Sequence, residues 1–109
     1  MALVHFSKDG FDKALASGGL MAVDFWAAWC GPCRMMGPVI DKLAQDYEGK
    51  AIVGKVNVDE EQELAIRYGV MSIPTVIFFK DGQEVERQVG LTPGADPVAE
   101  LSKIMDRNL

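Results

Sequence analysis

The sequence predicts an α/β fold in which four helices flank a mixed five-stranded sheet. Short apolar runs alternate with amphipathic stretches along the 109 residues, as expected for strands joined by helices. Asp81-Gly82 stands between two strand-like segments and is a strong signal for a two-residue hairpin. Helical crossovers favour parallel neighbours and the hairpin requires an antiparallel pair, so the sheet is expected to be mixed.

The first half of the chain alternates expected strands with expected helices. Leu3–Phe6 is a short strand candidate, and Ser7 is a suitable N-cap for the helix that follows it. The apolar run Leu20–Ala28 suits a central strand that is covered on both faces. A helix is expected over Pro32–Tyr47, because apolar side chains recur on one face at helical spacing. These side chains are Met36, Val39, Ile40, Leu43 and Tyr47.

The second half adds three strands and two helices. Ala51–Val58 is the next expected strand, and Asp59 is the expected N-cap of a short helix after it. Thr75–Lys80 and Gln83–Val89 are the two strands of the hairpin. Asp96-Pro97 is predicted to begin the last helix, because aspartate caps well and proline suits the first turn.

Composition and charge limit the function classes. The net charge is −5, which argues against nucleic acid or anionic lipid as partners. The longest apolar stretches are about half of the roughly 20 residues that a membrane-spanning helix needs. The first residues do not resemble a signal peptide, and no linker or repeat divides the chain. We therefore expect one domain over 1–109 that is monomeric and cytoplasmic.

The two cysteines, Cys30 and Cys33, come directly after the expected central strand, where sites of such sheets lie. A disulfide between them closes a very small loop and contributes little to stability. A zinc site needs more ligands, but the chain has no second cysteine pair and its one histidine is His5. The pair is therefore expected to carry chemistry, with no metal and no cofactor.

Thiol–disulfide exchange needs an attacking thiolate, a resolving thiol and access for the partner. Cys30 is expected at the start of a helix, where free N–H groups and the helix dipole should lower the pKa of its thiol. Cys33 lies one turn further and is expected to be more buried. Gly31 lets a substrate backbone approach, and Pro32 sets the first helical φ. Cys30 is thus expected to attack and Cys33 to resolve.

Asp24 is a carboxylate inside the apolar central strand, so burial should raise its pKa. Such a group can take the proton of Cys33 during resolution. The alternative is an aspartate whose hydrogen bonds merely relieve its burial. Lys55 in the next strand either reaches Asp24 and tunes it or points to solvent. Trp26 is interpreted as a core residue with some contact to the site.

Four separated segments resemble the thioredoxin family, and the resemblance covers essentially the whole chain. The segments are Val23–Ala27, Trp29-Cys30-Gly31-Pro32-Cys33, Ser72–Thr75 and Lys80–Gly82. The resemblance implies the thioredoxin fold and a thiol–disulfide oxidoreductase that acts through a mixed disulfide, with Asp24 as the buried acid. The Gly31-Pro32 pair accompanies the reducing members of the family, so reduction of protein disulfides is implied.

The resemblance also implies a groove for an extended target segment. Pro74 would be a cis proline packed against the cysteines, and the backbone of Ile73 would pair with the target as an added strand. Gly90 would line the same groove. Trp29 would present an aromatic surface beside Cys30.

Three departures from the family pattern concern partner preference rather than chemistry. Ala28 stands where a polar or charged residue is frequent, Gly37 where a bulkier residue is common, and Met71-Ser72 changes the loop before the proline. The partners implied are disulfide-containing proteins and thioredoxin reductase or an equivalent electron donor, because the chain has no nucleotide-binding fingerprint.

Two other function classes stay open. One is an adaptor without turnover, against which the retention of both cysteines together with Asp24 and Pro74 argues. The other is an oxidant or isomerase in an oxidising compartment, since the fold does not set the direction of exchange.

Overall fold

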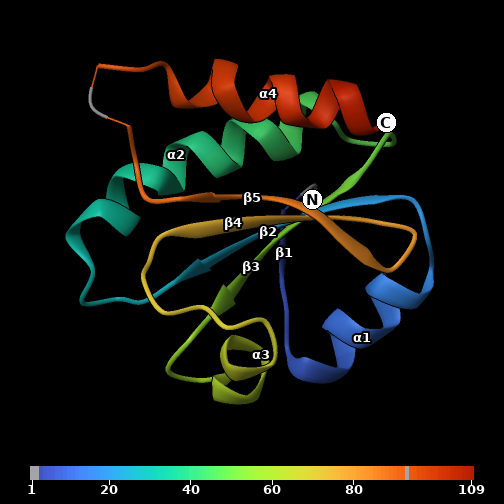
Figure 1. Cartoon of the computed structure of the whole chain (residues 1–109), viewed down its shortest axis with the longest axis horizontal. Helices are drawn as coiled ribbons and strands as arrows, with labels where there is room; N and C mark the ends of the chain where they lie inside the picture. The colour runs from blue at the N-terminus through green and yellow to red at the C-terminus, as the bar shows by residue number, and fades with distance from the viewer. Residues whose placement is uncertain (1–2, 93) are drawn as a thin grey trace.

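The computed structural model describes residues 3–92 and 94–109 and places one five-stranded sheet between two pairs of helices (Figure 1). The order of strands and helices along the chain is the order expected from the sequence. The elements are β1 (Leu3–His5), α1 (Lys8–Ala16), β2 (Leu20–Trp26), α2 (Gly31–Asp46), β3 (Ile52–Asn57), α3 (Gln62–Arg67), β4 (Thr75–Lys80), β5 (Gln83–Val89) and α4 (Pro97–Asn108).

The sheet is mixed, as expected, with the strand order β1-β3-β2-β4-β5. β3 pairs in parallel with both β1 and β2, whereas β4 pairs antiparallel with β2 and β5. β2 is the central strand, and every residue of it except Trp26 is buried. Since β2 leads directly into α2, the first turn of α2 lies at the carboxyl end of the most buried strand.

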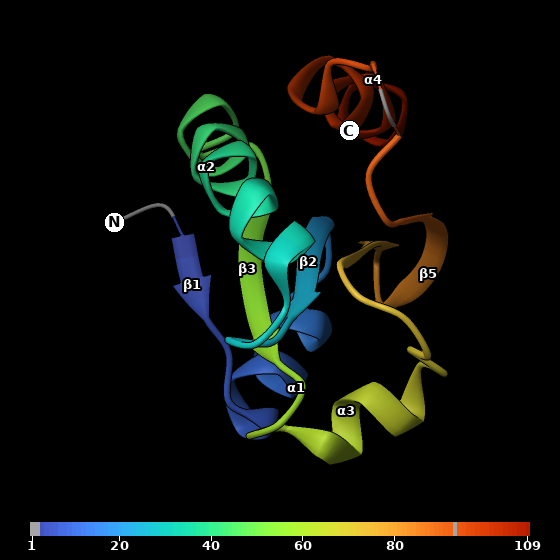
Figure 2. The ribbon, with the colours of Figure 1, turned by 90° about the vertical axis from the view of Figure 1, so that its left-hand side faces the viewer.

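The helices cover the two faces of the sheet in pairs, α2 with α4 and α1 with α3 (Figure 2). Along β2, Leu20 and Ala22 pack with α2 and α4, whereas Met21, Val23 and Phe25 pack with α1 and α3. Successive side chains of a strand point to opposite faces. The alternation therefore places the two remaining side chains of β2 on the α2 side. These are Asp24 and Trp26.

Two of the three expected helix caps are confirmed. Ser7 Oγ accepts a hydrogen bond from the backbone N–H of Gly10 at 3.1 Å, and Asp96 Oδ1 accepts one from Ala99 at 3.2 Å. Each cap satisfies a backbone donor that the first helical turn leaves free. Pro97 follows Asp96 as the first residue of α4.

The expected cap at Asp59 is wrong. α3 begins at Gln62, and its N-cap, Glu61, makes no side-chain hydrogen bond to the helix. The reason is competition from Asn57, whose side-chain oxygen accepts from the backbone N–H groups of Asp59 and Glu60 and forms a turn there. Side chains of this kind bond to nearby backbone and delay a helix start.

The hairpin matches its expected bounds at both strands. Asp81 and Gly82 both have positive φ, 50° and 85°, as a primed two-residue turn requires. Asp81 also accepts a hydrogen bond from the backbone N–H of Gly19 at 2.7 Å, which ties the turn to the start of β2.

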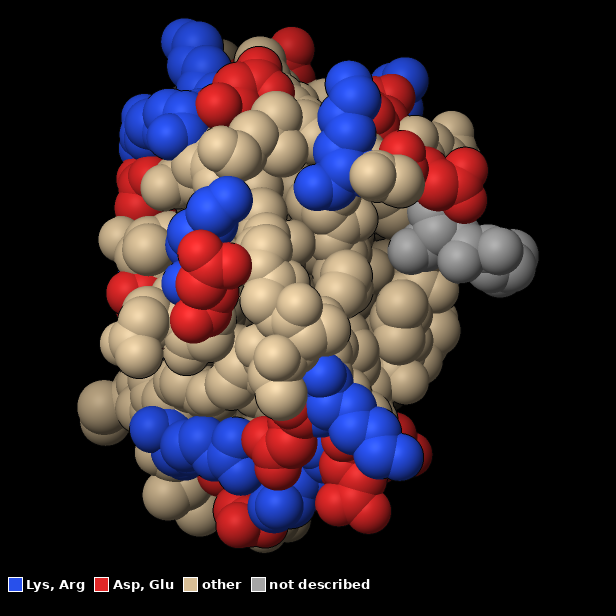
Figure 3. Space-filling model, turned by 90° about the vertical axis from the view of Figure 1, so that its right-hand side faces the viewer, with Lys and Arg blue, Asp and Glu red and all other residues tan. Residues whose placement is uncertain are grey.

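Charges of both signs are interspersed on the face seen in Figure 3, where Lys and Arg lie beside Asp and Glu at the top and at the bottom. Charged side chains of the described residues also form ion pairs, such as Arg67 with Asp12 at 2.6 Å. Exposed pairs of this kind contribute little to stability, but mixed signs avoid a surface field of one sign. Of the helices in residues 3–92 and 94–109, none is long and apolar enough to cross a membrane.

Candidate active site around Cys30 and Cys33

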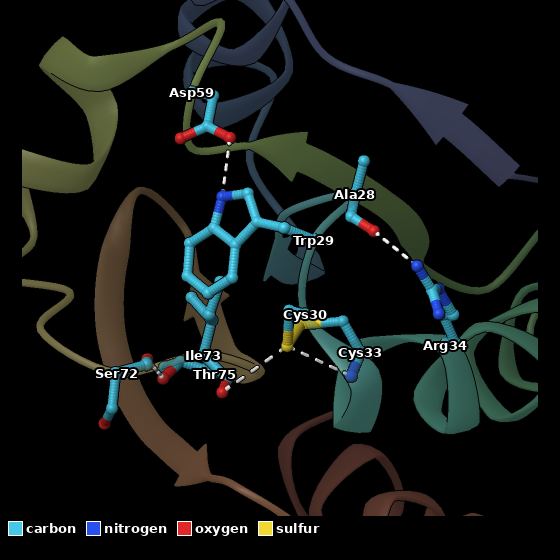
Figure 4. Close-up of a disulfide and its surroundings, with 9 residues drawn as sticks. All are labelled: Ala28, Trp29, Cys30, Cys33, Arg34, Asp59, Ser72, Ile73 and Thr75. Carbon is cyan, nitrogen blue, oxygen red and sulfur yellow. Dashed lines mark hydrogen bonds between the residues drawn. A yellow bond between two sulfur atoms is a disulfide. The ribbon is translucent and has the colours of Figure 1, made fainter.

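Cys30 and Cys33 form a disulfide at the N-terminus of α2 (Figure 4). Cys30 is the N-cap of the helix, and its sulfur accepts a hydrogen bond from the backbone N–H of Cys33 at 3.2 Å. The free N–H groups and the dipole of α2 therefore act on this sulfur. Gly31 and Pro32 form the turn between the cysteines and are the first two residues of α2.

The difference in burial between the two cysteines is very small in the disulfide form. Cys30 is 5% exposed and Cys33 is 4% exposed. The disulfide holds both sulfurs in the same helical turn, against Ala27 and the partly buried Trp26. What separates the cysteines is their surroundings, because the Cys30 sulfur lies next to the backbone of Ile73 whereas Cys33 lines a hollow of the surface.

Cys30 lies beside the loop before β4. Its sulfur is 3.8 Å from the carbonyl oxygen of Ile73 (Figure 4). The peptide bond between Ile73 and Pro74 is cis, which confirms the expectation from the family resemblance. Gly90 donates its backbone N–H to the carbonyl oxygen of Pro74 at 2.7 Å, so the start of β4 and the end of β5 meet here.

A groove of about 540 Å³ runs from these residues toward the start of α4. Three of the expected groove residues, Ile73, Pro74 and Gly90, line it, and Trp29 is not among its lining residues. Pro32, which was expected only to shape the turn between the cysteines, also lines it. Further lining residues were not expected from the sequence, because no motif marks them. Among these are Met35, Leu91 and Thr92.

Trp29 is 68% exposed beside the disulfide, as expected. Its indole N–H donates a hydrogen bond to Asp59 Oδ2 at 2.9 Å (Figure 4). Asp59 thus acts here by positioning an aromatic side chain instead of capping α3. No local signal in the sequence indicates this contact, because the two residues are separated by one helix, one strand and their flanking loops.

Asp24 is fully buried, and neither of its carboxylate oxygens has a hydrogen-bond partner among the described residues. Burial raises the pKa of Asp24 to about 7, and the charge of Lys55 acts in the opposite direction. The alternative weighed for this residue was hydrogen bonding to backbone or water, and no bond to the backbone is present among the described residues. The side chain lies on the face of the sheet that α2 covers.

Lys55 occupies the position of β3 that pairs with Asp24 of β2. It is half-buried, and its ammonium group lies 4.5 Å from the centre of the Trp26 ring. This contact with an aromatic face is favourable for a cation. Lys55 thus lies against Trp26, on the face of the sheet that also carries Asp24.

A second hollow, of about 280 Å³, lies behind Cys33 on the side away from the groove. Its lining includes Cys33, Lys55 and Trp26. Ala28 and Gly37, two small residues at positions where the sequence departs from the family pattern, also line it. Arg34 also lines it and donates a hydrogen bond to the Ala28 carbonyl oxygen at 3.2 Å (Figure 4). The hollow is wide enough to hold water molecules next to Cys33.

Comparison with known proteins decides the family. The family model "Thioredoxin" matches residues 2–106. The chain belongs to the thioredoxin family. Thioredoxins from Staphylococcus aureus strains Mu50 and MW2 are each 49% identical to it over 109 residues, with the whole of both chains covered. The solved structure of a mutant thioredoxin from Halobacterium salinarum NRC-1 is 36% identical, with a TM-score of 0.82 over 98% of this chain and 91% of that one.

As a thioredoxin, the chain is a thiol–disulfide oxidoreductase whose redox-active pair is Cys30 and Cys33. The family implies a reductase partner and disulfide-containing targets. Within the described residues, no three His, Cys, Asp or Glu side chains lie together as a metal ion would require.

Proposed function

We propose that this thioredoxin reduces disulfide bonds in other proteins and that Cys30 is the attacking thiol. The observation that carries the proposal is the place of the Cys30 sulfur. It caps the N-terminus of α2 and lies 3.8 Å from the carbonyl oxygen of Ile73, a residue of the groove. Helix N–H groups stabilise a thiolate at such a position, next to the surface that a target would contact.

An extended segment of the target lies along the groove in this proposal. It pairs with the backbone of Ile73 as a short added strand, which gives affinity without a specific sequence. Pro74 and Gly90 form the floor, and the exposed indole of Trp29 covers one side of the attacking sulfur. Gly31 and Pro32 keep the turn narrow enough for the target backbone to approach.

The reaction proceeds in two exchanges. The Cys30 thiolate attacks one sulfur of the target disulfide, a mixed disulfide forms, and the other target sulfur leaves and takes a proton. Cys33 then loses its proton and attacks the Cys30 sulfur, which releases the second target sulfur as a thiol. The target gains two electrons and two protons, and the Cys30–Cys33 disulfide forms.

Asp24 accepts the proton of Cys33 in the second exchange. Its pKa of about 7 suits proton transfer near neutral pH, and it lies on the face of the sheet that α2 covers. Water in the hollow behind Cys33 connects this region with solvent while a target covers the groove. Lys55 and Trp26 tune the acid from the same hollow.

The cycle requires an external electron donor, thioredoxin reductase or its equivalent, to restore the two thiols. We propose further that the chain works as one domain over 1–109, as a monomer, in the cytoplasm. The net charge of −5 and the interspersed surface charges support targets that are proteins rather than nucleic acids or membranes.

The midpoint potential of the Cys30–Cys33 couple tests the direction of the reaction. It is measured by equilibration with glutathione buffers, in which 30 mV corresponds to about 1.4 kcal/mol. We expect a couple that is more reducing than the glutathione pool. A distinctly more oxidising value would contradict the proposal and assign the chain to oxidation or isomerisation.

Trapping tests turnover and the roles of the two cysteines. With Cys33→Ser, the mixed disulfide cannot resolve, so target proteins should accumulate on Cys30. Cys30→Ser is the matched control and should trap none. Failure of Cys33→Ser to trap a disulfide-bonded protein would support the adaptor alternative.

A further inference from the structure

The methionines within residues 3–92 and 94–109 fall into two distinct classes of exposure, and three of them are buried. These are Met21 at 2%, Met36 at 1% and Met105 at 0% exposure. The other two, Met35 and Met71, are 69% and 96% exposed. A thioether at such exposure is open to oxidants, whereas a buried one is shielded.

One exposed methionine lines the groove of the site, and the other belongs to the loop that leads into it. Met35 lines the groove that also contains Ile73 and Pro74. Met71 stands two residues before Ile73, so the backbones of the two residues are within roughly 7 Å of each other. The carbonyl oxygen of Ile73 is the atom that lies 3.8 Å from the Cys30 sulfur.

We propose that Met35 and Met71 are sites of oxidation by peroxides and that their sulfoxides weaken the docking of protein targets without changing the disulfide chemistry. The inference rests on the proposed function, because it assigns a property to the same docking surface. It adds a small-molecule reactant, a hydroperoxide, that acts on the protein at two defined side chains.

The oxidation step needs no third reactant. The thioether sulfur attacks one oxygen of the peroxide, a sulfur–oxygen bond forms and the oxygen–oxygen bond breaks. The leaving hydroxide takes the proton of the transferred oxygen and becomes water. Sulfur loses two electrons and the peroxide gains them. In the disulfide form, Cys30 and Cys33 carry no thiolate, so the methionines are oxidised while the redox pair is protected.

The sulfoxide changes what the groove offers to a target. Met35 lies there with apolar neighbours such as Pro32 and Leu91. A methionine is flexible and apolar and adapts to different target side chains. Its sulfoxide is polar, and covering it with a target without a hydrogen-bond partner is unfavourable. A small disulfide that reaches Cys30 without filling the groove escapes this effect.

The first test maps the oxidation. The protein in its disulfide form is treated with hydrogen peroxide, and peptide mass spectrometry follows the addition of oxygen. We expect Met35 and Met71 to be oxidised before Met36, which is the adjacent buried control. Equal rates at Met35 and Met36 would overturn the proposal.

The second test measures activity. After treatment and re-reduction, kcat/KM should fall about fivefold with a disulfide-bonded protein. With 5,5′-dithiobis(2-nitrobenzoic acid), a small disulfide, it should stay unchanged. Unchanged activity on the protein substrate after both methionines are oxidised would overturn the proposal, as would an equal loss on both substrates.

Variants assign the effect to the two side chains. In the double variant Met35→Leu with Met71→Leu, activity before and after peroxide should be equal, whatever its starting value. Met36→Leu is the matched control and should lose activity like the parent chain. A loss of activity after peroxide treatment in the double variant would contradict the assignment of the effect to Met35 and Met71. Inability of the untreated protein to reduce either substrate would instead refute the proposed function.

Discussion

Asp24 of β2 and Lys55 of β3 occupy paired positions in the parallel ladder between these two strands. Their side chains therefore lie on the same face of the sheet, the face that α2 covers with its N-terminal disulfide. Burial raises the pKa of Asp24 to about 7, and the Lys55 charge limits the rise. The sheet thus holds an acid that titrates near neutral pH under the helix that carries Cys33.

Replacing the buried acid should slow one of the two exchanges. Asp24→Asn keeps the shape of the side chain but removes the base, so we predict resolution by Cys33 to slow about tenfold or more. The initial attack by Cys30 should change little, because α2 stabilises its thiolate independently. Stopped-flow measurement of mixed-disulfide formation and decay separates the two rates. Comparable slowing of both would refute the assigned role.

The same variant should change the pH dependence of stability. The pKa of Asp24 is about 7 in the folded chain against 3.8 for an unperturbed group. Between these values the folded chain binds more protons than the unfolded chain, so the free energy of unfolding falls as pH rises. The Asp24→Asn variant lacks this pH-dependent fall. Its free energy of unfolding, relative to that of the parent chain, should therefore rise by about 2–3 kcal/mol from pH 5 to pH 8.

Denaturant unfolding of the disulfide form at the two pH values measures this difference. Asp41→Asn, at an exposed position of α2, is the matched control. Its free energy of unfolding should differ from that of the parent by the same amount at both pH values. An Asp24→Asn advantage that is independent of pH would mean that the carboxyl group titrates normally in the folded chain.

The parts of the fold that were predicted correctly from the sequence are fixed by local chemistry. Asp81 and Gly82 can form the primed turn by themselves, so the hairpin strands were predicted to the residue. Ser7 and Asp96 cap helices through bonds within three residues. The expected cap at Asp59 was wrong because the Asn57 side chain accepts from the backbone N–H groups of Asp59 and Glu60 and holds this segment in a turn.

The candidate site was predictable only where a motif marks it. The cysteine pair, Asp24 and the groove at Ile73 and Pro74 follow from short segments of the sequence. The contact of Trp29 with Asp59 and the groove position of Met35 depend on tertiary packing. Equal burial of the two cysteines in the disulfide form also follows from geometry that spacing alone does not reveal.

Removing the charge next to the acid should shift the pH profile of resolution. The Lys55 charge lowers the pKa of Asp24, so Lys55→Met should raise this pKa further. At pH 7 a smaller fraction of Asp24 is then ionised, and resolution should slow about twofold to fivefold. Carbon NMR of the Asp24 carboxyl group follows the titration directly. Lys50→Met, at an exposed lysine, should leave it unchanged, and an unshifted Asp24 titration in Lys55→Met would contradict the coupling.

The hollow behind Cys33 can be closed from Gly37. A Cβ atom at this position would meet no heavy atom within 4 Å, so the backbone accepts a side chain there. Alanine in place of glycine inside a helix usually raises the free energy of unfolding by about 0.5–1 kcal/mol. At Gly37 this gain is reduced, because a side chain on the residue before a proline disfavours the helical backbone conformation. Gly37→Ala should therefore be close to neutral in stability and in rate.

Gly37→Leu carries the same backbone effect but extends into the hollow, so the comparison with Gly37→Ala isolates the filling. We predict slower resolution in Gly37→Leu, by about threefold to tenfold, because water is excluded from the space beside Cys33. The first attack by Cys30 should keep its rate, since the groove lies on the other side of α2. Stopped-flow kinetics of both exchanges in the two variants decides the matter, and equal resolution rates would show that the proton of Cys33 leaves by another route.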